Sequence, residues 1–521
     1  MVLITNSLGY DLIALVVTSL AGIILYLKWK FSYFARKGLY TPPTTLPFGN
    51  SKGIFTKQQI VAELFKDVYF DLKSRGLKHG GAYLLFKPFY IPVDLDIVKS
   101  IMQTDFQHFV NHGVFFNEKS DPLSAHLFAL EDDRWKSLRA KLTPTFTSGK
   151  MKMMFNTLVE CTSGLKDMVD QHSQDSTPIN IKETLQRFTI DIIGSVAFGI
   201  ECNSMKNPDS KFVKYGRRIF ELNPIEVMKN IAQFTFPHKL LKWLNIGVFN
   251  KEVTTFFMEV VKKNVNYREN NNIYRKDFMH LLLQLKNRGR VFEDEKLTND
   301  AGDINESGLT FNELAAQAFV FFLAGYETSS TAMTFALFEL STRPDLQQKI
   351  RDEIHAVLEK HDNKLTYDAI KDMTYLEQVI HESLRKYPPV PFLPRVCNKT
   401  YKVPGTDFVI EKDTMVGIPV LGIQNDPEIF PNPENFDPDR FSPENKAKRH
   451  QFSWIPFGEG PRVCIGLRFG TMQAKVGLVT ILQNYKISLN SKTATPIKFD
   501  TKSLGILAVD GNVWLNVEKC N

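Results

Sequence analysis

A single cysteine stands in a glycine-rich segment near the C-terminal end of the chain. Residues 454–470 read WIPFGEGPRVCIGLRFG, with Cys464 close to Arg462 and Gly466. A thiolate is stabilised as a metal ligand when the backbone N–H groups of a turn point at the sulfur. Glycines let the backbone turn tightly and approach a flat cofactor. Cys464 taken alone is better explained as a buried, inert cysteine in a glycine-rich turn.

The spacing Phe457-x-x-Gly460-x-Arg462-x-Cys464-x-Gly466 resembles the haem-ligand loop of the cytochrome P450 family. By average residue usage, this pattern arises by chance in about one of ten thousand such chains, which favours the haem-ligand interpretation. The resemblance implies that the Cys464 thiolate is the ligand of the iron of haem b. It also implies that Phe457 packs beneath the ring and that Arg462 pairs with a propionate.

Two further segments match the propionate-binding positions of the same family. Trp135 and Arg139 fit its Trp-x-x-x-Arg pattern, and their i,i+4 spacing puts them on one face of a helix. An ordinary amphipathic helix explains this pair as well. Arg395, in the segment FLPRVC, matches another propionate-binding arginine.

A glutamate and two arginines match a structural network of the family. Glu382 and Arg385 form its Glu-x-x-Arg pair, and Arg440 in FDPDRF supplies the second arginine. Taken alone, the pair at i,i+3 reads as a surface ion pair of little energetic value. The resemblance implies instead a buried Glu-Arg-Arg network that fixes the haem-binding region.

The segment Ala324-Gly-Tyr-Glu-Thr328 resembles the oxygen-activating signature of the family. The resemblance implies that Thr328 holds bound oxygen or a water by a hydrogen bond and that Glu327 relays protons. A glycine inside a helix costs about 1 kcal/mol relative to alanine. Gly325 is therefore predicted to leave room above the iron, with a local bulge in the helix. A threonine that bonds back to the carbonyl four residues earlier is the alternative for Thr328.

The element that carries this signature is a long helix. Thr310 and Glu313 form a capping box, and the apolar run continues to Arg343, before Pro344. Short β signals occur at 82–93 and at 401–420, the second with a Pro404-Gly405 turn. The sequence predicts a mainly α protein with small β-sheets. The resemblance implies the cytochrome P450 fold, with haem buried between the long central helix and the Cys464 loop.

The N-terminal part reads as a membrane anchor. Residues 12–27 carry no charge, and basic residues follow them directly. A cleaved signal peptide is the alternative, but no basic segment precedes the run and no cleavage site follows it. The positive-inside rule puts the following domain in the cytosol. We expect an anchor at 1–27, a basic and proline-rich hinge at 28–50 and a haem-thiolate monooxygenase domain at 51–521.

The composition limits the partners of the protein. The net charge is +7, and no motif for nucleic-acid binding is present. The five cysteines are widely spaced without a Cys-x-x-Cys pair, so neither disulfides nor a zinc site are expected. No flavin or nicotinamide fingerprint is present, so electrons must come from outside.

The resemblance implies NADPH-cytochrome P450 reductase as the electron donor, cytochrome b5 as a second candidate, and location in the endoplasmic reticulum membrane. We predict an electrostatic docking surface for the acidic reductase near the thiolate. A solvated charged surface is an equal explanation for each of its members. The residues of this basic surface are Lys136, Lys141, Lys446, Lys448 and Arg449.

The amino-acid sequences of several segments resemble those of insect microsomal enzymes that metabolise xenobiotics. The clearest are ELAAQAFVFFLAGYETSS and LRKYPPVPFLPR. The function implied is insertion of one oxygen atom of dioxygen into lipophilic substrates. Biosynthetic oxidation of fatty acids, terpenoids or steroids stays open, as do a haem-thiolate isomerase and a non-catalytic haem-binding protein. Family alignment predicts a substrate pocket formed by Phe115, Phe116, Phe321, Ala324, Val390, Phe392 and Leu504.

Overall fold

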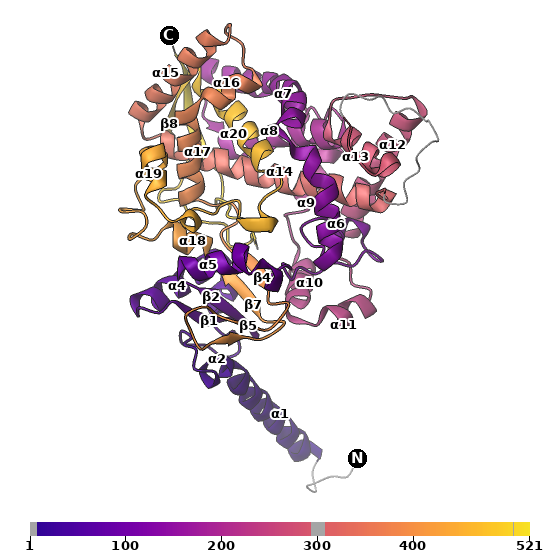
Figure 1. Cartoon of the computed structure of the whole chain (residues 1–521), viewed down its shortest axis with the longest axis vertical. Coiled ribbons are helices and arrows are strands. Elements are labelled where there is room, and N and C mark those ends of the chain that lie inside the picture. The colour runs from indigo at the N-terminus through magenta and orange to yellow at the C-terminus, as the bar shows by residue number, and fades with distance from the viewer. Residues whose placement is uncertain (1–7, 293–307, 504, 521) are drawn as a thin grey trace.

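The protein is described by a computed structural model that covers residues 8–292, 308–503 and 505–520. Helices fill most of the body, and a small sheet lies at the end from which the N-terminal helix projects (Figure 1). The predicted fold class, mainly helical with small sheets, is confirmed.

The helices before residue 300 are α1 (Leu8–Phe31), α2 (Tyr33–Arg36), α3 (Lys52–Phe55), α4 (Val61–Ser74), α5 (Leu95–Lys99), α6 (Asp132–Leu142), α7 (Ser148–Gln174), α8 (Ile181–Ile193), α9 (Lys211–Arg218), α10 (Pro224–Thr235), α11 (His238–Trp243), α12 (Lys251–Asn270) and α13 (Phe278–Arg288). The later helices are α14 (Phe311–Leu340), α15 (Pro344–Lys360), α16 (Tyr367–Asp372), α17 (Thr374–Lys386), α18 (Val420–Gln424), α19 (Pro443–Ala447) and α20 (Leu467–Leu482). Short helical turns include η5 (Gly194–Phe198) and η8 (Gly460–Arg462).

The long helix α14 crosses the middle of the body (Figure 1). The capping box is present, because Thr310 Oγ1 accepts from Glu313 N and the Glu313 carboxylate accepts from Thr310 N. Its 30 residues correspond to about 45 Å. The prediction that it continues to Arg343 is wrong by three residues. A residue before proline is disfavoured in the α conformation, so Arg343 leaves the helix and Pro344 begins α15.

The strands form three small sheets. The largest has the order β1-β2-β7-β4, in which β2 and β7 are parallel and the other pairs antiparallel. The predicted β signal at 82–93 is a hairpin, and Gly405 has a φ of +70° in the turn between β5 and β6. The strands are β1 (His79–Leu84), β2 (Lys87–Pro92), β3 (Ile179–Asn180), β4 (Leu393–Val396), β5 (Tyr401–Lys402), β6 (Val409–Ile410), β7 (Met415–Ile418), β8 (Tyr485–Leu489) and β9 (Trp514–Lys519).

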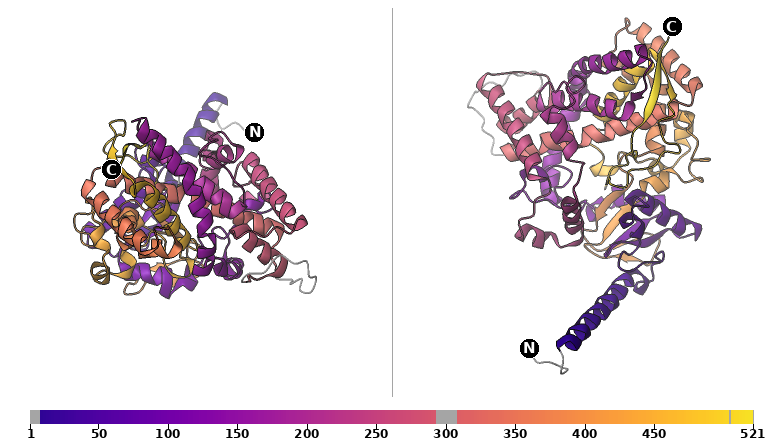
Figure 2. Two further views of the ribbon diagram at one scale, coloured as in Figure 1. Left: turned by 90° about the horizontal axis from the view of Figure 1, so that it is seen from above. Right: turned by 180° about the vertical axis from the view of Figure 1, so that it is seen from behind.

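The body contains two clusters of buried apolar side chains. The larger surrounds α14 and includes α7, α8, α17 and α20, while the smaller joins α4 and α5 to the sheet of β1, β2 and β7. Seen from behind, α1 extends away from the body on the side of the smaller core (Figure 2). The Cys464 loop and α14 contribute mostly to the larger core.

The helix α1 contains a stretch, Gly9–Phe31, that is long and apolar enough to cross a membrane, and within the described ranges no other helix meets that test. Its last turns are part of the body, because Leu27 and Phe31 are buried. Phe34 in α2 is fully buried against Tyr83, and the Tyr33 hydroxyl donates to Glu411 Oε2 at 2.8 Å. The start of the predicted hinge is thus packed on the sheet.

Candidate active site

The Cys464 loop has a fixed backbone. Gly458 and Gly460 both have a φ of +71°, a conformation that side chains rarely adopt. A Cβ at Gly460 would lie 2.0 Å from the carbonyl oxygen of Met102. The Cys464 N–H donates to the Phe457 carbonyl at 2.8 Å, and α20 begins three residues later. Only glycine fits at Gly460, and this holds the cysteine at a defined place.

A cavity of about 390 Å³ lies between the Cys464 loop and α14, a size typical of small-molecule sites. Cys464, Phe457 and Arg462 line it from the loop, and Ala324 and Thr328 line it from α14. Most of the other wall residues are apolar. The structure therefore brings together two sequence segments that the resemblance assigned to opposite sides of a haem.

The Cys464 side chain is exposed and lines this cavity. Burial raises the pKa of its thiol, while the Gly466 N–H and the Arg139 guanidinium lower it. A hydrogen-bond donor and a cation beside the sulfur are the groups that stabilise a thiolate.

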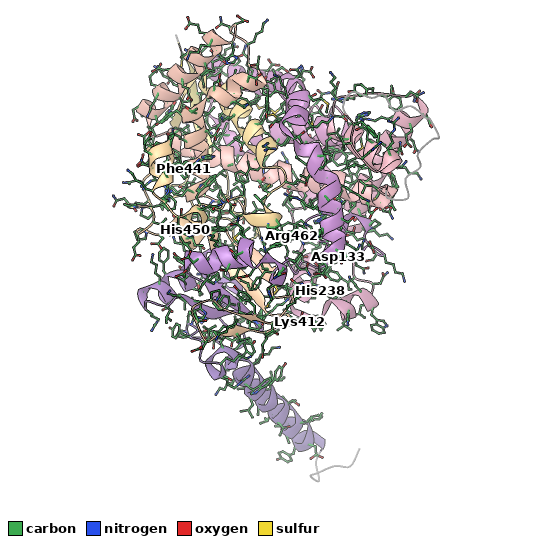
Figure 3. The ribbon with its side chains drawn as sticks, viewed as in Figure 1. Asp133, His238, Lys412, Phe441, His450 and Arg462 are labelled. Atoms are coloured by element: carbon green, nitrogen blue, oxygen red, sulfur yellow. The ribbon has the colours of Figure 1, made fainter. Side chains whose placement is uncertain are left out.

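Three arginines line the same cavity, and within the described part of the chain none of them forms an ion pair with a carboxylate. Arg395 is 1% exposed, its Nε has no partner, and burial lowers its pKa to about 10. Arg462 donates to the carbonyls of Val110, Leu127 and Leu130. Burial and the neighbouring Arg395 and Arg139 lower its pKa to about 9. Buried cations without counter-charge form a site for an anionic group. Figure 3 shows Arg462 near the middle of the molecule, between the helical part and the sheet.

Trp135 completes this cationic wall. The Arg462 guanidinium lies 4.0 Å from the centroid of its ring, a cation–π contact. Trp135 and Arg139 are one turn apart on α6, and both line the cavity. The structure thus places Trp135, Arg139, Arg395 and Arg462 around one space, although they come from three separate segments.

Sequence reasoning missed two histidines in this wall. His112 and His126 are buried and line the cavity. The His112 Nδ1 lies 2.8 Å from the Phe128 carbonyl, and burial with the charges of Arg395 and Arg462 holds the pKa of His112 well below its usual range. Burial lowers the pKa of His126 to about 4. The signal available in the sequence was the presence of three histidines, His108, His112 and His126, within the aromatic stretch 106–128.

The residues present fit the haem that the resemblance implies. A thiol supplies one ligand to iron, and the unpaired arginines match two propionates. Gly466 lines the cavity, and a Cβ built on it meets nothing within 4 Å, so the backbone there is open to a flat ring. The individual roles predicted for Phe457, Gly466 and the propionate-binding residues remain predictions.

Gly325 lines the main cavity and also lies against α8, and its role in leaving room above the iron stays a prediction. A Cβ at Gly325 would lie 2.5 Å from Ile193 Cδ1, so the space left by the missing side chain is occupied by α8. The predicted bulge is not present, because α14 is unbroken from Phe311 to Leu340, all of which is described. The glycine allows two helices to approach closely.

Thr328 and Glu327 point to different spaces. The Thr328 hydroxyl donates to the Ala324 carbonyl at 2.5 Å, the alternative that the sequence left open, yet Thr328 also lines the main cavity. Glu327 is 7% exposed and lines a second, separate cavity of about 10 Å³. Burial raises the pKa of its carboxyl group, and Gln186 Nε2 donates to both carboxylate oxygens, at 3.1 and 3.3 Å.

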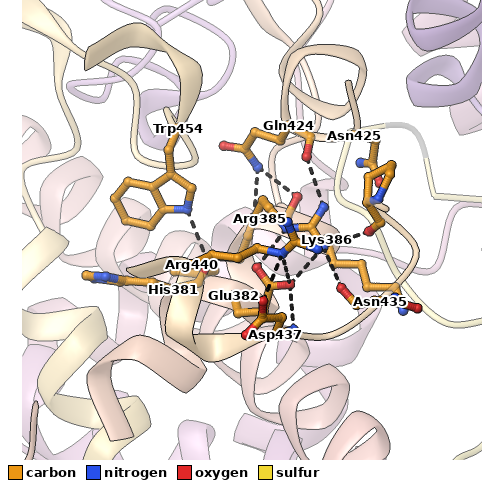
Figure 4. Close-up of polar contacts among 12 residues, drawn as sticks. His381, Glu382, Arg385, Lys386, Gln424, Asn425, Asn435, Asp437, Arg440 and Trp454 are labelled. Atoms are coloured by element: carbon orange, nitrogen blue, oxygen red, sulfur yellow. Dashed lines mark hydrogen bonds and ion pairs between the residues drawn. The ribbon is translucent and has the colours of Figure 1, made fainter. Parts of the chain in front are cut away.

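Glu382, Arg385 and Arg440 lie together (Figure 4), next to Trp454, whose Nε1 donates to the His381 carbonyl at 3.2 Å. Glu382 and Arg385 are fully buried and form two bonds, at 2.7 and 2.9 Å. Arg440 Nε lies 3.4 Å from Glu382 Oε1, an ion-pair distance without hydrogen-bond geometry. Arg385 also donates to the carbonyls of Gln424, Pro433 and Asn435.

The predicted substrate pocket is only partly assembled. Phe321, Ala324 and Val390 line the cavity, whereas Phe115, Phe116 and Phe392 do not. Each of these three packs elsewhere, Phe115 on His238, Phe116 on Lys242 and Phe392 on Phe65. Leu504 lies outside the described residues.

The five residues of the predicted basic surface differ in their exposure to solvent. Lys136, Lys446 and Lys448 are exposed, and Lys141 is partly buried. Arg449 is also partly buried, with its guanidinium 4.9 and 5.1 Å from the rings of Phe430 and Phe441. Its charge is thus partly engaged inside the protein.

Comparison with known proteins agrees with this site. The family model "Cytochrome P450" matches residues 42–514. "Cytochrome P450 6a2" of Drosophila melanogaster is 41% identical over 507 residues, 96% of this chain and 98% of that protein. "Cytochrome P450 6A1" of Musca domestica is 42% identical over 505 residues, 96% of each chain. "Cytochrome P450 6k1" of Blattella germanica is 39% identical over 524 residues, all of this chain and 99% of that protein.

Proposed function

This chain belongs to the cytochrome P450 family and is a P450 monooxygenase, and from that premise we propose that it oxidises lipophilic xenobiotics such as plant toxins and insecticides. The observation that carries the proposal is the apolar cavity with the Cys464 thiol and unpaired arginines in its wall. An apolar cavity of this kind favours lipophilic molecules, which need no polar partners. Phe321, Ala324 and Val390 are the proposed substrate contacts.

In this proposal the chain holds haem b through Cys464, and Arg139, Arg395, Arg462 and Trp135 hold its propionates. When bound, haem supplies the oxygen-activating chemistry, which a thiolate ligand promotes by donating electron density. The protein orients the substrate and excludes water from the apolar cavity.

Two side chains of α14 handle protons in the proposed reaction. The Thr328 hydroxyl lines the cavity, and its oxygen can accept a hydrogen bond while its proton is donated to the Ala324 carbonyl. Burial raises the pKa of the Glu327 carboxyl group one residue away, which favours its protonated form. A positioned acid of this kind contributes typically 10²–10⁴-fold to a proton-transfer step.

We propose that electrons come from NADPH through the reductase, with cytochrome b5 as a second donor. The exposed Lys136, Lys446 and Lys448 support a docking role for the basic surface.

Two parts of the chain support contact with the membrane. The helix α1 supports anchoring in the endoplasmic reticulum membrane, with the domain that follows it in the cytosol. The exposed apolar side chains of α11 and its ends, Phe236, Leu240, Trp243 and Leu244, support a second contact with the bilayer.

The test is the optical difference spectrum of the reduced protein with and without carbon monoxide, for wild type and Cys464→Ala. A red-shifted Soret band in the wild type that is absent in the variant is expected. Consumption of NADPH with lipophilic compounds and reductase then separates a monooxygenase from an isomerase, which needs no electrons. A wild-type protein that is folded and haem-loaded but lacks the band would contradict the proposal.

A further inference from the structure

One face of α8 holds three consecutive residues of α14. Ile193 Cδ1 occupies the space beside Gly325, and Thr189 Oγ1 donates to the Tyr326 carbonyl at 3.0 Å. Gln186 Nε2 donates to the Glu327 carboxylate at 3.1 and 3.3 Å. In α8 these three side chains are spaced i, i+3 and i+7, which is the spacing of one helix face.

Glu327 is held away from the main cavity. It is absent from the wall that Thr328 helps to form, and it lines instead the second cavity between α14, α8 and the C-terminal segment. The polar groups of that second cavity are Lys182, Gln186, Glu327, Ser330, Thr331 and Thr334. We call this space the polar chamber. Its volume of about 10 Å³ is close to the minimum that holds one water molecule.

The charges around the carboxyl group make Gln186 its main partner. Lys182 Nζ donates to the carbonyls of Val509 and Gly511, at 2.7 and 3.0 Å, and within the described residues it forms no ion pair with Glu327. The other titratable groups that act on Glu327 are Asp500, from the C-terminal segment, and the Tyr326 hydroxyl on its own helix. Burial raises the pKa of the Glu327 carboxyl, whereas the Gln186 donor and the Lys182 charge lower it.

We propose that Gln186 is a positioning residue for proton delivery: its amide keeps the Glu327 carboxyl in the polar chamber, so that protons enter from the α8 side. Glu327 gives its proton toward the Thr328 side and regains one from chamber water, so its own protonation is restored in each cycle. This inference rests on the proposed monooxygenase function. Gln186 does not touch the substrate or the reacting oxygen, and it acts through Glu327.

The experiment compares full-length, haem-loaded variants with reductase and a lipophilic substrate. Gln186→Met keeps the length of the side chain and removes the amide, and Gln186→Glu keeps the shape but replaces the donor with an oxygen. Glu327→Gln is the reference for complete loss of the acid. The matched control is Thr184→Val, because Thr184 lies on the same helix and its hydroxyl donates to Met168 Sδ on α7.

Two readouts separate positioning from a structural role. The first is hydrogen peroxide released per product formed, which we expect to rise about tenfold in both Gln186 variants, less than the about hundredfold typical of losing a catalytic acid. The second is the infrared carbonyl band that Glu327 gives when it is protonated, followed over a pH titration and assigned by its loss in Glu327→Gln. Without the amide donor the band should shift in frequency and persist to higher pH, while Thr184→Val leaves both readouts unchanged.

An unchanged band and peroxide ratio in both Gln186 variants, with Glu327→Gln strongly uncoupled, would overturn the inference and leave the proposed function intact. A wild-type protein without the carbon monoxide band would instead overturn the proposed function, and the inference with it. A change in Thr184→Val as large as in Gln186→Met would assign the effect to α8 packing and overturn the positioning role.

Discussion

The molecule contains two arginine clusters that differ in their counter-charges. The first is Arg385 and Arg440 with Glu382, and the second is Arg139, Arg395 and Arg462 in the wall of the main cavity. Arg385 is fully buried and bonded to the Glu382 carboxylate and to three carbonyls. Arg395 is equally buried, but one carbonyl is its sole partner among the described residues and its Nε has none. A buried charge costs several kcal/mol unless it is paired. The first, complete cluster is therefore paired within the protein itself, and the second, incomplete cluster has no carboxylate partner among the described residues, which suits it to an anionic ligand.

Breaking the complete cluster should have the largest effect. Glu382→Ala leaves Arg385 fully buried without a counter-charge and leaves Arg440 only its longer contact with Asp437, so the free energy of unfolding should fall by about 3–5 kcal/mol. Urea denaturation followed by circular dichroism measures this loss. The control is Glu434→Ala, at an exposed position in the same loop, which should change stability by less than about 0.5 kcal/mol. A loss of equal size in both variants would contradict the comparison.

Removing a member of the incomplete cluster should weaken ligand retention rather than folding. Arg395→Met deletes a buried unpaired cation, so the secondary structure and unfolding midpoint of the haem-free protein should be retained or improved. Loss of haem to a competing apoprotein should accelerate about a hundredfold, as expected for truncating one partner of a buried charge pair worth about 3 kcal/mol. Unchanged haem loss would show that Arg395 is not completed by the propionates.

Protonation of His126, which lies in the same cavity wall as the incomplete cluster, should destabilise the folded protein. Burial lowers the pKa of His126 from 6.5 to about 4, so the folded protein excludes a proton that the unfolded chain binds. Stability is therefore lost as the pH falls from about 6.5 towards 4, by about 2 kcal/mol at pH 4.5. His126→Leu should remove this part of the pH dependence, as measured by urea midpoints at pH 7 and pH 4.5. Identical pH dependence in both proteins would contradict this assignment.

Within the complete cluster, Arg440 has a weaker contact with Glu382 than Arg385 has. Arg440 contacts Glu382 at 3.4 Å without hydrogen-bond geometry, whereas Arg385 bonds it twice. Arg440→Lys should lower the free energy of unfolding by about 1 kcal/mol, and Arg385→Lys by clearly more, because lysine cannot reproduce a bidentate contact. Differential denaturation of the two variants checks the order, and the reverse order would contradict it.

Local sequence rules predicted the parts of the molecule that local interactions decide. The capping box at Thr310, the hairpin strands and the turn at Gly405 follow from residues within a few positions of one another. The C-terminal end of α14 was placed three residues too late, because Pro344 fixes the start of α15 and not the last residue of α14, which is Leu340. Boundaries are set by single residues, whereas element type is set by the whole pattern.

The sequence by itself determined the family, the Cys464 loop and the anchor-like helix, because glycine geometry, residue spacing and apolar length are local properties. Only the tertiary structure decided that Ile193 fills the space beside Gly325, that Glu327 faces a chamber apart from Thr328, and that Phe115 packs away from the cavity. It also paired Arg462 with the carbonyl of Val110, 352 residues away. Such contacts depend on how distant helices pack, since burial and pairing of a side chain are set by neighbours that no short sequence window contains.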